Sequence, residues 1–220
     1  GGLGGMVIAL HAERPARAQE AAAAPVFAPE AFIRILPDGR IAIAVNRVEL
    51  GQGVTTALPM ILADEMDADW SRVEPELAPG EDVYKDPIFG IQVVAGSASI
   101  TNSFQQYREL GAKARALLVA DAAARWGVAT SDCRTEASVV TGPGGQTATY
   151  AELADEAASL PLPETVALKD PSAFRLIGKP TRRLDSRAKG DGSFKFAIDF
   201  DSPDMRVAII LRPPSSGVRR

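Results

Sequence analysis

The sequence predicts an α+β fold, in which short strands and amphipathic helices share one core. Residues 32–46 contain two runs of alternating apolar and polar side chains around a Pro-Asp-Gly turn, a pattern typical of a β-hairpin. Residues 103–126 place apolar side chains three and four positions apart, which is the spacing of one helix face. Both periods occur in a chain of 220 residues, long enough for one large domain or two small ones.

The N-terminal hairpin is the first predicted element. Its turn is Pro37-Asp38-Gly39, because proline and glycine there favour a tight reversal. A helix is expected over residues 56–66, after a Gly51-Gln52-Gly53 turn. Thr56 is its predicted N-cap, and Pro59 then falls in the first turn, where a missing N–H costs nothing. The hairpin positions expected to be buried are Ile33, Ile35, Ile41, Ile43 and Val45.

A second glycine-containing turn precedes the long helix. Residues 72–78 are expected to form a short strand, and the turn lies in "VVAGSASITNS", residues 93–103. Ser103 and Gln106 form a predicted capping box at the start of the helix that reaches Trp126. A glycine in the sequence immediately after Trp126 is expected to end this helix.

The last third of the chain contains weaker patterns. The segment "ASVVTGPGG", residues 137–145, indicates a strand and a loop. A short helix follows, with Thr149 and Glu152 as its capping box. Residues 193–214 are expected to form two strands joined by Ser202-Pro203-Asp204.

Three regions are predicted: an export-signal remnant and linker over residues 1–29, a main domain over 30–163, and a linker with the start of a second domain over 164–220. Residues 2–10 are apolar but too few to span a bilayer, so no stable membrane span is expected. Ala16-Arg17-Ala18 fits a small-x-small cleavage site, which indicates a truncated export signal and a periplasmic location. The alternatives are a disordered Ala/Gly-rich tail and a cloning artefact.

The composition excludes several classes of site. Cys133 and His11 are the only cysteine and histidine, so an internal disulfide and a metal site built from Cys and His clusters are excluded. For the same reason, a catalytic triad that uses histidine is not expected, and redox chemistry would need a bound cofactor. Nucleic-acid binding is not expected, because the basic residues near the C-terminus are not interleaved with aromatic side chains.

The two glycine turns are the candidate binding elements. A helix N-terminus presents unpaired N–H groups that attract anions, and glycine lets a ligand approach the backbone. Gln52 adds one amide, which suits the edge of a heterocycle, and Ser97 and Ser99 add hydroxyls. A flat polar heterocycle that carries a phosphate is therefore one hypothesis. The alternative is that Gly51 and Gly53 serve tight turns only, with Gln52 in water.

Several segments in this order resemble the molybdopterin-binding subunit of the isoquinoline 1-oxidoreductase group, in the xanthine dehydrogenase and aldehyde oxidase superfamily. They are "VELGQGVTTALPMILADEMDADWSRVEPELAP", "DPIFGIQVVAGSASITNSFQQYRELGAKARALLVADAAARWGV", "LKDPSAFRLIGKPTRRLD" and "FAIDFDSPDMRVAIILRPP". The resemblance covers residues 27–213 and corresponds to the N-terminal part of that subunit. It implies a molybdopterin-binding subdomain of mixed strands and helices, followed from residue 179 by the start of a hammerhead-like α/β domain.

The resemblance also implies a cofactor and its contacts. The cofactor would be a molybdenum pterin, in its cytosine dinucleotide form. The family's Glu-Met-Gly-Gln-Gly motif corresponds to Glu49-Leu50-Gly51-Gln52-Gly53, so Gln52 would hydrogen-bond the pterin. The family's small-residue turn corresponds to Gly96, Ser97, Ala98 and Ser99, whose N–H groups and hydroxyls would contact the cofactor.

The implied reaction is hydroxylation of an N-heteroaromatic carbon, or oxidation of an aldehyde, with oxygen from water. Electrons would leave through a small partner subunit with two [2Fe–2S] clusters and, in exported members, a cytochrome c subunit. The remainder of the large subunit and a small-molecule substrate are the other expected partners.

No catalytic residue is assigned. The family's glutamate base lies in a Gly-Glu-Pro segment that this sequence does not contain, so we expect the chain alone to be inactive: a fragment, a split-gene product or a cut piece. Asp64, Glu65, Asp67 and Asp69 are expected to form a solvated face, and Glu49 to be structural or solvent-facing. A non-catalytic binding or assembly module, or an anion-binding domain unrelated to molybdenum, are the competing hypotheses.

Overall fold

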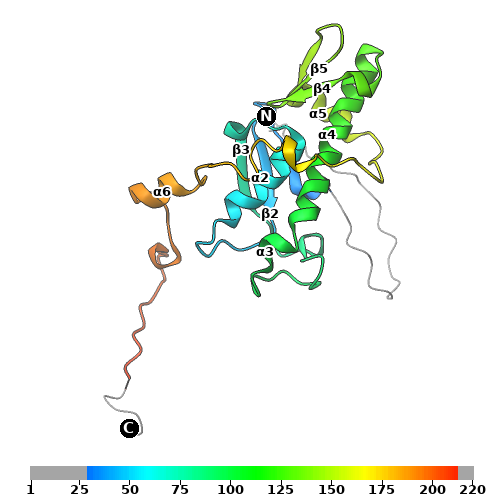
Figure 1. Cartoon of the computed structure of the whole chain (residues 1–220). Helices are drawn as coiled ribbons and strands as arrows, with labels where there is room; N and C mark the ends of the chain where they lie inside the picture. Colours follow the sequence, from blue (N-terminus) through cyan, green and yellow to red (C-terminus); the bar gives the residue numbers. More distant parts are fainter. Residues whose placement is uncertain (1–28, 213–220) are drawn as a thin grey trace, which may run out of the picture. The chain divides into compact units, whose positions relative to one another are not determined.

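The structure is a computed structural model that describes residues 29–212 (Figure 1). The predicted export-signal remnant at residues 1–29 falls almost wholly outside these residues. The chain divides into two compact units, one ending at Leu184 and the other beginning at Asp185, which is later than the predicted boundary at 163/164. No helix in the described part of the chain has the length and apolar character needed to cross a bilayer.

Helices and strands alternate along the chain, as an α+β fold requires. The α-helices are α1 (Pro29–Phe32), α2 (Val54–Met66), α3 (Ala98–Thr101), α4 (Phe104–Trp126), α5 (Tyr150–Ala158) and α6 (Ser186–Asp191). The strands are β1 (Ile33–Ile35), β2 (Ile41–Val45), β3 (Val73–Leu77), β4 (Arg134–Glu136), β5 (Val139–Thr141) and β6 (Thr147–Thr149). Short 3₁₀ turns are η1 (Trp70–Arg72), η2 (Asp82–Tyr84), η3 (Thr130–Asp132), η4 (Pro171–Ala173) and η5 (Ala197–Asp199).

The first sheet has the order β1-β2-β3. The predicted hairpin is confirmed: β1 and β2 are antiparallel, with Ile33 opposite Ile43. β3 then pairs with β2 in parallel, with Ile41 opposite Val73, and α2 forms the crossover between them (Figure 1). The five hairpin positions predicted to be buried are all at most 1% exposed. In such a unit the loops that follow parallel strands meet at one edge of the sheet.

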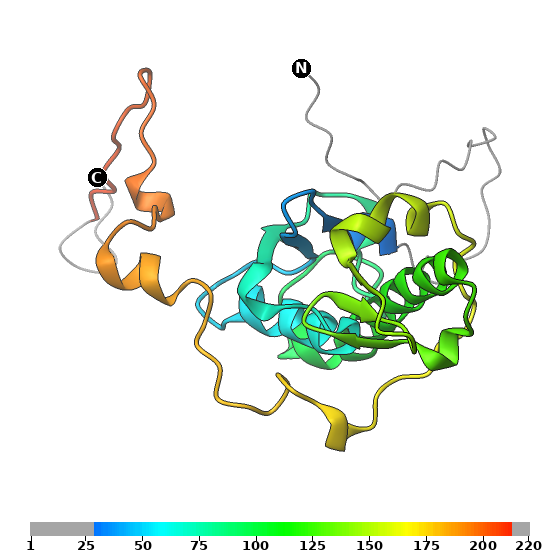
Figure 2. The ribbon, with the colours of Figure 1, turned by 90° about the horizontal axis from the view of Figure 1, so that it is seen from above.

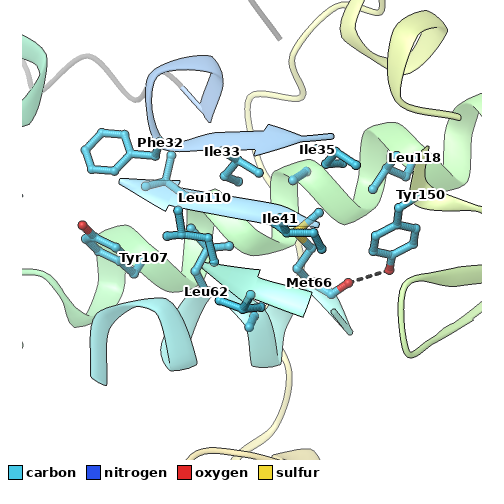
Figure 3. Packing of buried hydrophobic residues seen from close by; sticks show 14 of the residues in the cluster. Phe32, Ile33, Ile35, Ile41, Leu62, Met66, Tyr107, Leu110, Leu118 and Tyr150 are labelled. Atoms are coloured by element: carbon cyan, nitrogen blue, oxygen red, sulfur yellow. Dashed lines mark hydrogen bonds between the residues drawn. The ribbon is translucent and has the colours of Figure 1, made fainter. Parts of the chain in front are cut away.

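The core lies between this sheet and helices α2 and α4 (Figure 3). Tyr107, Leu110 and Leu118 of α4 and Leu62 and Met66 of α2 are all at most 1% exposed. The Tyr150 hydroxyl donates to the Met66 carbonyl at 2.6 Å, which ties α5 to the end of α2. This arrangement buries the apolar stripe that was predicted for residues 103–126.

The second sheet has the order β4-β5-β6 and is antiparallel throughout. The strand predicted within residues 137–145 is β5, and the capping box of α5 is confirmed. The Glu152 N–H donates to the Thr149 hydroxyl at 3.3 Å, and the Thr149 N–H donates to the Glu152 carboxylate at 2.7 Å. This sheet lies with α4 and α5, away from the two glycine turns (Figure 1).

Two helix starts differ from the prediction. α2 begins at Val54, two residues before the predicted N-cap Thr56, with Gly53 as N-cap in the left-handed region. The capping box of Ser103 and Gln106 is wrong: the Ser103 hydroxyl instead accepts from the guanidinium of Arg47, at 2.8 Å. A buried cation outside the helix thus takes the oxygen that the helix N–H groups would use.

The connecting segment, residues 164–184, runs along α2 within the first unit, and the predicted solvated face of acidic residues is wrong (Figure 2). The Asp64 carboxylate is 2% exposed and accepts the N–H groups of residues 175–177 at 2.9–3.1 Å. Glu65 is fully buried and accepts the Lys169 N–H at 3.1 Å. The connecting segment has little regular structure, so its backbone donors need such acceptors.

The second unit, described over residues 185–212, contains α6 and η5 but no strand. The two strands predicted for residues 193–214 are therefore wrong, although the turn exists, with the Met205 N–H donating to Ser202 O at 2.9 Å. Ile198, Val207 and Ile209 are all at least 86% exposed. An alternating segment becomes a strand only when another strand accepts its backbone hydrogen bonds, and the described residues provide none.

Candidate functional site

The Gly51-Gln52-Gly53 turn follows β2 and starts α2. Its backbone N–H groups are bound by the carboxylate of Glu49, which accepts from Gly51 at 2.8 Å, Gly53 at 2.9 Å and Thr55 at 3.1 Å. Burial raises the pKa of Glu49, but the bonds from Gly53, Thr55 and Gly51 outweigh it and bring the pKa to about 2. The expected structural role of Glu49 is confirmed, and the chain's own anion occupies the start of α2.

Gln52 lies on the exposed side of this turn, and its side-chain amide folds back on the loop. Its Nε2 donates to Val48 O at 2.8 Å, and its Oε1 accepts from Leu50 N–H at 2.5 Å. A primary amide has two N–H donors and two acceptor lone pairs, so one of each remains for a ligand. The two internal bonds fix the plane of the amide and therefore the direction of the remaining pair.

The second turn is strained at a serine. Gly96 and Ser97 have φ values of 60° and 56°, in the left-handed region that side chains other than glycine rarely adopt. Ala98 is 7% exposed, whereas Ser97 is exposed and Ser99 is half-buried. The strained serine is a feature that residue patterns alone do not indicate, and strain of this kind concentrates at functional sites.

Two cavities connect the surroundings of the two turns. One, of about 360 Å³, is lined by Gln52 and Gly53 from the first turn and by Ile100 of α3, directly after Ser99. The other, of about 430 Å³, is lined by Val48 and Leu50 before the first turn and by residues 92–94 before the second. The two turns thus border the same pair of cavities at the edge of the sheet where parallel strands β2 and β3 end.

A buried ion pair, missed in the sequence, holds the loops around these cavities. Arg47 Nη2 lies 2.6 Å from Asp86 Oδ2, and both side chains are at most 1% exposed. Asp86 also accepts the N–H groups of Ile88 and Phe89 at 2.8 Å. Burial raises the pKa of Asp86, but these N–H groups, the Asn102 amide and Arg47 together lower it. A basic residue after a strand and an Asp-Pro pair were the only signals available.

The residues present fit a polar, flat ligand. A Cβ added at Gly51 or at Gly96 would meet no atom within 4 Å, so both turns are open toward a ligand. Asn46 Nδ2 and Arg47 Nε, on residues that line the larger cavity, are buried without a hydrogen-bond partner in the described part of the chain. Within residues 29–212, no three His, Cys, Asp or Glu side chains gather as metal ligands.

Comparison with known proteins gives a family for this arrangement. The family model of the molybdopterin cofactor-binding domain matches residues 4–198. The beta subunit of isoquinoline 1-oxidoreductase from Brevundimonas diminuta is 33% identical over 229 residues, which cover 86% of this chain and 29% of that protein.

Two further curated relatives are more distant in length. The membrane-bound aldehyde dehydrogenase [pyrroloquinoline-quinone] of Gluconacetobacter polyoxogenes is 33% identical, over 86% of this chain and 24% of that protein. A nicotinate dehydrogenase component of Pseudomonas putida is 30% identical, over 84% and 15%. The chain therefore spans less than a third of the length of each of these relatives.

Two solved structures show weaker similarity. Quinoline 2-oxidoreductase from Pseudomonas putida 86 has a TM-score of 0.45 and 22% identity, over 64% of this chain and 19% of that chain. The Cu,Mo-CO dehydrogenase has a TM-score of 0.42 and 23% identity, over 56% and 15%.

Proposed function

Because this chain belongs to the molybdopterin cofactor-binding domain family, we propose that it forms the N-terminal part of the cofactor-binding subunit of an oxidoreductase. The enzyme would hydroxylate N-heteroaromatic compounds or oxidise aldehydes, with oxygen from water. The observation that carries this proposal is that both glycine turns border the same two cavities. The names of the three curated relatives, all oxidoreductases, support the class of reaction.

The residues of this chain would hold the molybdenum pterin through amide and backbone groups. Gln52 would offer its remaining N–H and lone pair to the pterin edge. Gly96, Ser97, Ala98 and Ser99 would offer N–H groups and hydroxyls to the phosphate end of a cytosine dinucleotide form. When bound, the cofactor supplies the two-electron redox chemistry, and this chain supplies orientation.

The rest of the enzyme would come from other segments. We propose a catalytic glutamate in the remainder of the large subunit, so that this chain alone is inactive. A small subunit with [2Fe–2S] clusters would take the electrons, and a cytochrome c subunit would take them onward in the periplasm. Residues 185–212, with their exposed apolar side chains, would complete a hammerhead-like domain against that remainder.

Metal and pterin analysis tests this proposal. The chain is produced with the DNA that follows and precedes it, and the purified assembly is assayed for molybdenum and for the fluorescent oxidation product of the pterin. We expect both in amounts close to one per large subunit. An assembly that is folded and complete but contains neither would support the competing role of a non-catalytic binding or assembly module.

A further inference from the structure

The connecting segment approaches the Gly51-Gln52-Gly53 turn at its end. The Leu184 N–H donates to the Thr56 hydroxyl at 3.0 Å, in the first turn of α2. Arg183, one residue earlier, donates from Nη1 to the Gly51 carbonyl at 2.8 Å. Its Nη2 lies 3.4 Å from the Glu49 carboxylate. A segment more than a hundred residues away in sequence therefore contacts the predicted cofactor turn directly.

Arg183 and Glu49 bind opposite polarities of the same turn. Glu49 accepts the N–H groups of Gly51 and Gly53, while Arg183 donates to the Gly51 carbonyl. The two side chains also attract each other, because one is cationic and the other anionic. With both its donors and its acceptor bound, the turn has little freedom to change its φ and ψ angles, although glycine alone would allow wide freedom.

We propose that Arg183 is a positioning residue, which locks the Gly51-Gln52-Gly53 turn in the conformation that presents Gln52 to the cofactor. This inference rests on the proposed function. Arg183 and Gln52 line the same 360 Å³ cavity, so the lock stands beside the amide that it orients. The far end of the connecting segment is fixed by Asp64 and Glu65, which holds the backbone of Arg183 in register along α2.

Hydrogen–deuterium exchange of the chain tests the lock without any cofactor. In Arg183→Ala, we expect amides of residues 49–55 to exchange about tenfold faster or more, with the β1–β2 hairpin unchanged, because loss of the lock allows local opening. Arg183→Lys keeps one donor for the Gly51 carbonyl and should lie between. Arg182→Ala is the matched control, because its neighbouring side chain is exposed and is charged alike. In the assembled enzyme, molybdenum content should fall in Arg183→Ala only.

Two results would overturn the inference. One is equal exchange at residues 49–55 in the Arg183→Ala and Arg182→Ala variants. The other is acceleration throughout the hairpin as well, which would mean that Arg183 only stabilises the whole unit. Failure of the proposed function looks different: the exchange is local as expected, but molybdenum is unchanged both in this variant and in Gln52→Ala.

Discussion

The guanidinium of Arg47 and the carboxylate of Asp86 form a buried ion pair at 2.6 Å between the loop after β2 and the loop before α3. Removing one partner of such a pair leaves an uncompensated buried charge. We expect Arg47→Ala to lower the free energy of unfolding by about 3–5 kcal/mol, measured by urea denaturation. Arg40→Ala, which removes an exposed ion pair with Asp38 and Glu74, should change it little. Equal losses in the two variants would contradict this account.

The pKa of Glu49, about 2 against its ordinary value of 4.5, makes part of the stability depend on pH. A carboxyl whose pKa is lowered on folding stabilises the fold at pH values above 4.5, and this contribution is lost as the pH falls through about 2. Glu49→Gln should therefore be about 1 kcal/mol less stable than the wild type at neutral pH. The difference should shrink as the pH falls from 5 toward 2, in denaturant titrations at each pH. A difference that stays constant would show that the charge of Glu49 is unimportant.

Asp64 is expected to hold the connecting segment onto α2. Asp64→Asn replaces one acceptor oxygen with an NH₂ group, which cannot accept the N–H groups of residues 175–177. We expect a loss of about 1–3 kcal/mol in unfolding free energy and faster proteolysis within residues 164–184. The control is Asp155→Asn, because Asp155 is exposed on α5. Unchanged proteolysis of the connecting segment in Asp64→Asn would refute this role.

Gly111 allows α2 and α4 to approach closely. A Cβ at this position would lie 2.3 Å from the Leu62 carbonyl oxygen, which is backbone and cannot move aside alone. Gly111→Ala should therefore destabilise the protein by about 1–3 kcal/mol in thermal or urea unfolding. Gly80→Ala introduces a methyl group into open space and serves as the control. A stable Gly111→Ala variant would mean that the two helices separate easily.

The sequence was informative where local chemistry decides the structure. The hairpin follows from alternation and a Pro-Asp-Gly turn, and the capping box of α5 follows from Thr149 and Glu152 three residues apart. Gly127 ends α4 in the left-handed region, as predicted. These features depend on residues close in sequence, so single-chain patterns are sufficient to predict them.

Long-range polar contacts could not be predicted from such patterns. Asp64 and Glu65 have the composition of a solvated face, but they bind a segment a hundred residues later. Ser103 meets the capping pattern, but it binds Arg47, 56 residues earlier. For the candidate site, the sequence predicted both turns; their shared cavities and the clamping contacts of Glu49 and Arg183 appear only in three dimensions.

The most direct measurement of the central claim is the molybdenum content of the assembled enzyme carrying Gln52→Ala, determined after extensive dialysis. Gln105→Ala provides the control, because Gln105 is an exposed glutamine of α4 that bonds Glu109 on its own helix. We expect Gln52→Ala to lose most of its molybdenum while its thermal unfolding matches that of the control. Full molybdenum retention in Gln52→Ala would contradict the assignment of this turn to the cofactor.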